Sequence, residues 1–129
     1  MKQGYAIIKK VDGGFYVDEV DFSKYESYGY IRSFIPNYVE VYGLPDGFDI
    51  WVDEEGKING EPPNVVIADE YDYIMEILHG NIVILSSDEE GNTLPLTERQ
   101  VDKFFDHYLQ GKLLITQYGF YETITLGNN

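Results

Sequence analysis

The stretch N-I-V-I-L-S-S, Asn81 to Ser87, has the strongest strand signal in this chain. A short apolar run bounded by polar residues is typical of a buried strand. The tetrapeptide D-E-E-G follows it at 88–91 and also follows the apolar run F-D-I-W-V at 48–52, where it occupies 53–56. Acidic residues beside glycine favour turns, so we expect both tetrapeptides to end strands. Their shared acidity calls for an explanation.

Further strand signals come in pairs, each pair joined by a glycine-containing turn that favours a hairpin. The turn D-G-G joins the first pair, P-D-G the second, and Gly119 the third. The expected strand pairs are 4–11 with 15–20, 38–44 with 48–52, and 113–118 with 120–126. Between them, G-E-P-P-N (60–64) predicts a break in regular structure, because consecutive prolines remove two backbone donors.

Helix signals occur in two places in the first two thirds of the chain. A capping box, S-K-Y-E at 23–26, predicts a helix that Pro36 ends. Apolar residues at helical spacing predict a second helix from Asp69 or Glu70 to His79, with Gly80 after its last turn.

A third helix is expected after the buried strand. T-E-R-Q at 97–100 is another capping box, apolar residues follow it at helical spacing, and Gly111 would end the helix. A chain of 129 residues fits one domain. We therefore expect a single α+β domain, with a twisted antiparallel or mixed sheet and about three helices in the order ββα-ββ-α-β-α-ββ.

The composition excludes several classes of protein. There is no cysteine, so disulfides, thiol nucleophiles and cysteine-ligated metals are excluded. The N-terminal segment does not resemble a signal peptide, and no apolar run reaches the length of a membrane span. We expect a soluble protein of the cytoplasm.

The net charge is −14, and most of it lies in the middle of the chain. Residues 37–76 contain eleven acidic side chains and one basic side chain, Lys57. A field of this sign repels nucleic acids and anionic membranes and attracts basic surfaces. We therefore expect a basic protein partner, with no direct binding to nucleic acid or membrane; the oligomeric state is left open.

Motifs for catalysis are weak. The only histidines, His79 and His107, match a helix end and a helix surface, and Ser86 and Ser87 lack a nucleophile-elbow motif. Neither D-E-E-G segment has the alternating oxygen ligands of a calcium loop, and no phosphate-binding loop is present. We predict no catalytic residue, no metal and no cofactor.

Closely spaced carboxylates remain as the candidate binding groups. Glu98, Asp102 and Asp106 would follow one helix face about every 6 Å, and Asp69, Asp72 and Glu76 would do the same on the preceding helix. Such a surface can imitate a nucleic-acid backbone, although carboxylates also serve solubility alone. The candidate partner-binding residues are Asp53, Glu54, Glu55, Asp88, Glu89, Glu90, Glu98, Asp102 and Asp106.

Four segments together resemble a family of small domains. They are Y-G-L-P-D-G-F (42–48), D-E-E-G-K-I-N-G-E-P-P-N (53–64), G-N-I-V-I-L (80–85) and L-T-E-R-Q (96–100). Their order is similar to that in a domain family of unknown function encoded by phages, prophages and conjugative elements. The resemblance covers residues 1–110 and implies that 111–129 is a C-terminal β-hairpin extension.

That resemblance implies a genomic setting rather than an activity. Small acidic proteins of mobile elements are often anti-CRISPR or antirestriction factors, so the leading hypothesis is a non-enzymatic DNA mimic that blocks the nucleic-acid groove of a host defence nuclease such as Cas9. One alternative is a small-ligand-binding protein that sequesters a signal near Trp51 and the G-E-P-P-N loop, with Lys9, Lys10 or Arg32 supplying positive charge. Another is a regulatory or scaffold protein of the mobile element.

Overall fold

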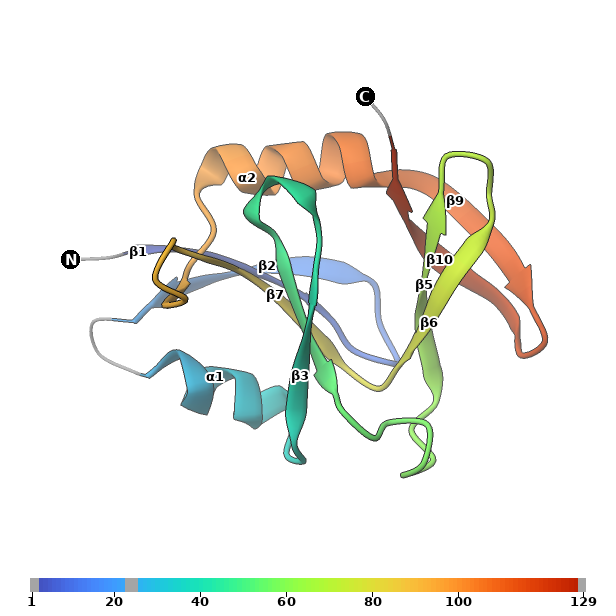
Figure 1. Ribbon diagram of the computed structural model, residues 1–129, viewed down its shortest axis with the longest axis horizontal. Coiled ribbons are helices and arrows are strands. Elements are labelled where there is room, and N and C mark those ends of the chain that lie inside the picture. Colours follow the sequence, from blue (N-terminus) through green and yellow to red (C-terminus); the bar gives the residue numbers. More distant parts are fainter. Residues whose placement is uncertain (1–2, 23–25, 128–129) are drawn as a thin grey trace.

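The computed structural model describes residues 3–22 and 26–127, which form two β-sheets and two α-helices (Figure 1). The first sheet contains β1 (Gln3–Lys9), β2 (Phe15–Asp21), β3 (Val39–Gly43), β4 (Asp49–Asp53), β7 (Ile82–Ser87) and β8 (Thr93–Leu94). The second contains β5 (Pro63–Asp69), β6 (Ile74–His79), β9 (Leu109–Thr116) and β10 (Gly119–Leu126). The helices are α1 (Ser27–Phe34) and α2 (Glu98–Lys103), the latter continued by a π-helical turn, η2 (Phe104–Tyr108).

The predicted buried strand is the centre of the first sheet. β7 pairs with β1 on one side and β4 on the other, in the order β2-β1-β7-β4-β3, and β8 pairs with its far end. All these pairings are antiparallel. The four residues 82–85 are fully buried, because α1 covers one face of the strand and the second sheet covers the other. Both predicted N-terminal hairpins are confirmed, with the P-D-G turn forming a short 3₁₀ segment, η1 (Pro45–Gly47).

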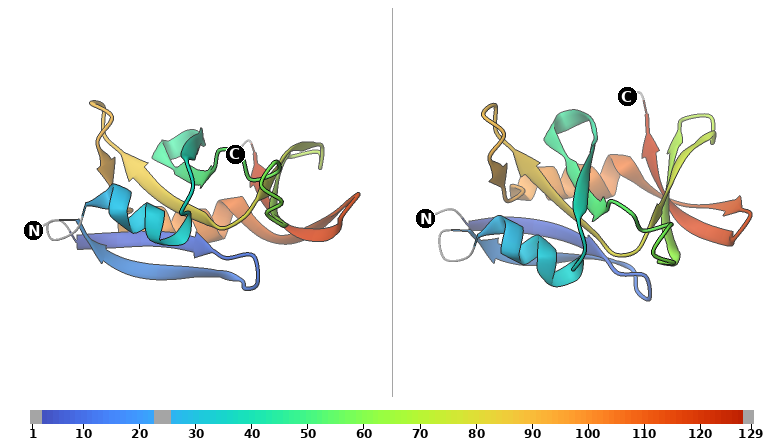
Figure 2. Two further views of the ribbon diagram at one scale, coloured as in Figure 1. Left: turned by 90° about the horizontal axis from the view of Figure 1, so that it is seen from below. Right: turned by 60° about the horizontal axis from the view of Figure 1, so that its bottom comes forward.

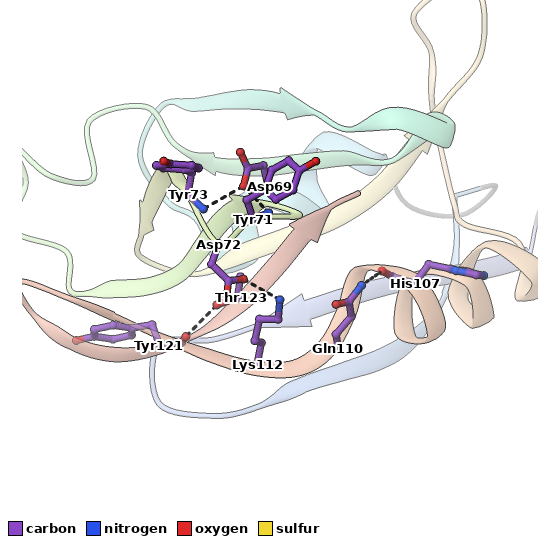
Figure 3. Close-up of polar contacts among 9 residues, drawn as sticks. All are labelled: Asp69, Tyr71, Asp72, Tyr73, His107, Gln110, Lys112, Tyr121 and Thr123. Atoms are coloured by element: carbon purple, nitrogen blue, oxygen red, sulfur yellow. Dashed lines mark hydrogen bonds and ion pairs between the residues drawn. The ribbon is translucent and has the colours of Figure 1, made fainter. Parts of the chain in front are cut away.

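The second sheet is completed by the C-terminal hairpin. Its order is β6-β5-β10-β9, and β10 pairs in parallel with β5 while the other pairs are antiparallel. Ile124 on β10 is fully buried in the main core. An ion pair of 2.7 Å joins Asp72, on the β5–β6 turn, to Lys112 on β9 (Figure 3). This contact ties the β5–β6 turn to β9 across β10.

Two apolar clusters hold the layers together. Ala6, Ile8, Val83 and Leu85 face α1, which contributes Ile31 to this cluster. The opposite face of the first sheet packs against the second sheet and η2, in a larger cluster whose aromatic centre is Phe48, Phe104 and Tyr108. Figure 1 shows the result, with α1 and α2 separated by the strands of the first sheet.

A buried polar contact joins the two sheets. Asn64 on β5 is 1% exposed, and its Nδ2 donates to the carbonyl oxygens of Lys9 (2.9 Å) and Gly80 (2.8 Å). Its Oδ1 accepts a hydrogen bond of 2.6 Å from Lys9 Nζ. Lys9 ends β1 in the first sheet, and Gly80 lies between β6 and β7, where the chain passes from the second sheet to the first. One carboxamide therefore fixes three segments at the junction.

The expected α+β class is wrong. About 50% of the described residues are in strands and 18% in helices, so the domain is mainly β, with two α-helices where three were expected. Regular structure also begins earlier than expected in the G-E-P-P-N segment, since Pro63 and Asn64 belong to β5.

The second expected helix does not form. Residues 69–79 make the end of β5, a turn and β6, and the carboxylate of Asp69 caps that turn by accepting the N–H groups of Tyr71 (2.8 Å) and Tyr73 (3.0 Å), as Figure 3 shows. Asp72 takes a φ of +67° there, a backbone conformation that aspartate tolerates better than most residues. The helical periodicity of this segment rests on only three isoleucine or leucine residues and is therefore weak. Pairing of β6 with β5 outweighs it.

The third helix is shorter than expected. Its capping box is confirmed: Thr97 Oγ1 accepts the Gln100 N–H (3.1 Å) and Gln100 Oε1 accepts the Thr97 N–H (2.9 Å). The α-helix ends at Lys103, however, and passes through η2 directly into β9. Gly111, with φ +69°, lies within β9 and does not end the helix. α1 is confirmed, but it begins at Ser27 with Glu26 as its N-cap and without a side-chain capping bond, so the capping box predicted at 23–26 does not begin it; Ser23 itself lies outside the described residues.

We predict that Asn64→Ala lowers the free energy of unfolding by about 2–4 kcal/mol, because two buried carbonyl oxygens and the Lys9 ammonium lose a partner. Urea denaturation followed by circular dichroism measures the loss. The control is Asn59→Ala, at an exposed turn position, which should change stability by about 0.5 kcal/mol or less. Equal losses in the two variants would contradict the junction role of Asn64.

Lys9 makes stability depend on alkaline pH. Burial lowers the pKa of its ammonium below 10.5, and the nearby Glu122 and Asp12 carboxylates oppose that shift. Since the unfolded chain then holds the proton more tightly, stability should rise with pH in the window below 10.5. We expect the unfolding free energy of the protein minus that of Lys9→Met to increase from neutral pH to 10.5, because tyrosine ionisation is common to both proteins. A constant or falling difference in denaturation titrations would refute this.

Candidate functional site

The two D-E-E-G segments form the same local turn. Asp53 Oδ1 accepts the N–H of Glu55 at 2.8 Å, and Asp88 Oδ1 accepts the N–H of Glu90 at 2.9 Å. Hydrogen bonds from Asn92 and Glu90 also lower the pKa of Asp88. In both tips the aspartate therefore builds the turn. Asp53 is only 8% exposed and accepts a further bond from Asn37, so it presents less of its side chain to solvent than the glutamates that follow it.

The glycines of the two tips have different roles. Gly91 has a φ of +85°, which a glycine adopts without strain. Gly56 is required by space, since a Cβ there would lie 2.9 Å from the carbonyl oxygen of His79. The remaining pairs of carboxylates, Glu54 with Glu55 and Glu89 with Glu90, are exposed.

The structure does not bring the two tips together. β4 and β7 run antiparallel, with Asp49 opposite Leu85 and Trp51 opposite Val83. Asp53 therefore lies beyond one end of this strand pair and Asp88 beyond the other, about 20 Å apart at the strand rise per residue. Both views of Figure 2 place the β7–β8 turn at one end of the molecule, away from the segment that follows β4. A single partner surface that includes both tips must span that length.

The end of β7, just before the second D-E-E-G tip, contacts the start of α2. Gln100 Nε2 donates to Ser86 Oγ (3.3 Å), and Ser86 Oγ donates to the Gly47 carbonyl (2.9 Å), so the start of α2, the end of β7 and the P-D-G turn are held together. We call five of the exposed carboxylates on this side the acidic ridge: Glu89, Glu90, Glu98, Asp102 and Asp106; one exposed basic residue, Arg99, follows Glu98 on α2.

A basic side chain next to the ridge is already paired. Lys103 lies 3.0 Å from Asp46, which also accepts a 2.6 Å hydrogen bond from the hydroxyl of Tyr108. These two donors lower the pKa of Asp46, and burial together with Asp46 raises the pKa of Tyr108. Asp46 has a φ of +67°, and this contact holds the turn in that conformation. The carboxylate of Asp46 offsets the positive charge of Lys103, so Lys103 reduces the negative potential of the ridge only a little.

The other tip borders a cleft of about 400 Å³. Its walls are residues 40–42 of β3, 52–58 at and after the end of β4, and 76–79 of β6. Carboxylates predominate among its charged groups, with Lys57 paired to Glu76 across it at 3.3 Å. A second hollow lies under residues 34–36 and also touches Asp53, Glu61, Gly80 and Asn81.

The metal-ligating groups, histidines and serines that the sequence offered for catalysis have the following surroundings. No group of three or more histidine, aspartate and glutamate residues among the described residues could hold a metal ion. His79 Nδ1 lies 2.8 Å from the Glu61 carbonyl, and its ring packs edge-on against Tyr118. His107 is exposed, and its carbonyl accepts a hydrogen bond from Gln110 (Figure 3). Ser86 bonds to backbone and glutamine, without a histidine partner.

Sequence reasoning missed three features of this surface. It placed Asn64 and its neighbours near a ligand pocket, whereas Asn64 joins the sheets. It did not foresee the contact of Tyr108 with Asp46, because these residues come from distant segments. It also missed the cleft, because the strand β6 that forms one wall was predicted to be a helix.

The part of the chain that the structure describes contains no helix long and apolar enough to cross a membrane. Comparison with curated proteins and with solved structures finds no match. A family model does match residues 1–109, close to the extent of 1–110 expected from the resemblance. The chain therefore belongs to the DUF3846 family, a domain of unknown function.

Proposed function

We propose that this protein is a non-enzymatic inhibitor of the anti-CRISPR type, encoded by a phage or another mobile element and acting in the host cytoplasm. In this proposal its acidic ridge occupies the basic nucleic-acid groove of a defence nuclease, with a Cas9-type effector as the candidate, and excludes DNA.

The observation that carries the proposal is the acidic ridge. Glu98, Asp102 and Asp106 are exposed and follow one another about every 6 Å along α2 and η2. B-DNA carries one charge per about 3.4 Å of axis on each strand, so the ridge offers about one carboxylate for every two phosphates. Like charges at this spacing disfavour a helix by a few tenths of a kcal/mol per pair, so helix stability does not account for them.

The two D-E-E-G tips supply a matched test. Glu89→Gln with Glu90→Gln should slow association with a purified, guide-loaded Cas9-type effector by about threefold to tenfold at low salt, because exposed charges act mainly on the association rate. Glu54→Gln with Glu55→Gln makes the same charge change in the other D-E-E-G segment. It should slow association less than the first pair of substitutions does. Biolayer interferometry measures both rates.

Competition with target DNA tests the mode of inhibition. The unmodified protein should displace duplex DNA from the effector, and roughly 0.5 M salt should abolish displacement through screening. Binding that is insensitive to salt, or binding that leaves DNA in place, would refute the mimicry. Failure to bind any Cas9-type effector would exclude this partner class.

A further inference from the structure

We propose that the cleft beside the first D-E-E-G tip binds an extended, basic peptide segment of a partner protein, which adds as a strand to the free edge of β3. This inference does not rest on the proposed function, because the cleft and the acidic ridge involve different carboxylates at opposite ends of the β4–β7 pair.

The cleft lies between two unpaired strand edges. Among the described residues, β3 is the last strand of the first sheet and pairs with β4 alone, and β6 is the last strand of the second sheet and pairs with β5 alone. Consecutive residues of each strand, 40–42 and 76–79, line the cleft. Successive side chains of a strand point to opposite faces, so consecutive lining residues mean that the strand edges themselves border the cleft.

The free edge of β3 has backbone groups available for pairing. Leu44 donates its N–H to Phe48, and the carbonyl of Tyr38 accepts the N–H of Glu54. The even-numbered residues therefore face β4, and since β3 keeps a regular register with β4, the odd-numbered ones direct N–H and C=O away from it. Val41 is the central one of these. Unpaired edges of this kind are the site of strand addition.

Charge selects a basic segment. The cleft is lined by four glutamates and by one lysine, Lys57. The glutamates are Glu40, Glu54, Glu55 and Glu76. The ammonium of Lys57 lies 3.3 Å from Glu76, so the cleft already holds one cationic side chain, from its own wall. A partner's arginine or lysine would compete with it.

His79 provides an independent indication of a hydrogen-bond donor. It lines the cleft and is 8% exposed. Its Nδ1 faces the carbonyl of Glu61, which can only accept, so Nδ1 is the donor and, in the neutral ring, Nε2 carries the lone pair. Nε2 is buried without a hydrogen-bond partner. This nitrogen can accept a hydrogen bond, and an arginine or lysine of the bound segment supplies a donor.

The two faces of β3 also indicate the pattern of the segment. Glu40 pairs opposite Val52 on the side of the larger apolar cluster, while Val41 lies on the side of the α1 cluster and is 43% exposed. An added strand presents alternate side chains to these two faces. The matching sequence therefore alternates basic residues, toward Glu40 and the cleft, with apolar residues, toward Val41.

Fluorescence anisotropy with a labelled Arg-Val-Arg-Val-Arg peptide, the length of β3, tests the proposal. The unmodified protein should bind this peptide, and a Glu-Val-Glu-Val-Glu peptide should not bind. Glu54→Gln with Glu55→Gln should weaken binding about tenfold, and Glu89→Gln with Glu90→Gln should leave it unchanged. Equal weakening by both pairs would overturn the assignment, since it would mean non-specific attraction to the net charge.

Lysine variants test the same site with the opposite expected result, which is tighter binding of the peptide. Lys57→Gln should tighten peptide binding severalfold, because it removes the competing ammonium. Lys103→Gln makes the same charge change at the Asp46 pair and should have no effect. Tightening by Lys103→Gln alone would contradict the location of the site.

The strand geometry needs its own experiment. Val41→Pro removes an outward N–H without removing a bond to β4, and it should abolish peptide binding but not stability. N-methylation of alternate peptide nitrogens tests the same pairing in the unmodified protein and should have the same effect. Peptide binding that survives N-methylation would overturn strand addition. Spermine that binds as tightly as the peptide would do the same, because it would show that the site takes small cations.

Discussion

The carboxamide of Asn64 is the constraint on which the arrangement of the two sheets depends. It is almost fully buried and connects the end of β1 with the passage from β6 to β7. A buried polar group is stable only when its partners are in place, so this contact favours one relative placement of the sheets over others that would bury the same apolar area. It also positions β6 beside the end of β4, and the cleft lies there.

The repeated D-E-E-G shows how one short motif combines structure and charge. In both copies the aspartate stabilises the turn, because its carboxylate accepts a hydrogen bond from the N–H group two residues later. The two glutamates are not needed for that bond and remain exposed. A turn can therefore be stable while its outer charges are chosen for another purpose. This division makes the glutamate pairs informative positions for substitution, because they can change without loss of the turn.

The acidic side chains are distributed over separate surfaces. The acidic ridge follows β7 and α2, the cleft lies between β3 and β6, and a third group surrounds the β5–β6 turn, where Lys112 pairs with Asp72. A net charge of −14 opposes the compact state through self-repulsion. Ion pairs of Lys57, Lys103 and Lys112 each lie within one of these groups and reduce the repulsion locally.

The sequence by itself determined the local elements that depend on neighbouring residues. The hairpins with glycine turns, the buried strand β7, the Thr97 capping box and both acidic turns follow from short-range hydrogen bonding and from hydrophobic period. The tertiary structure decided the rest. Residues 69–79 satisfy a helical spacing, but Asp69 caps a turn and β5 offers a partner strand, so the segment becomes β6. Likewise β10 enters the second sheet beside β5, and Asn64, Tyr108 and Asp46 find partners more than 15 residues away. Such contacts depend on which strands lie side by side, and no local pattern contains that information.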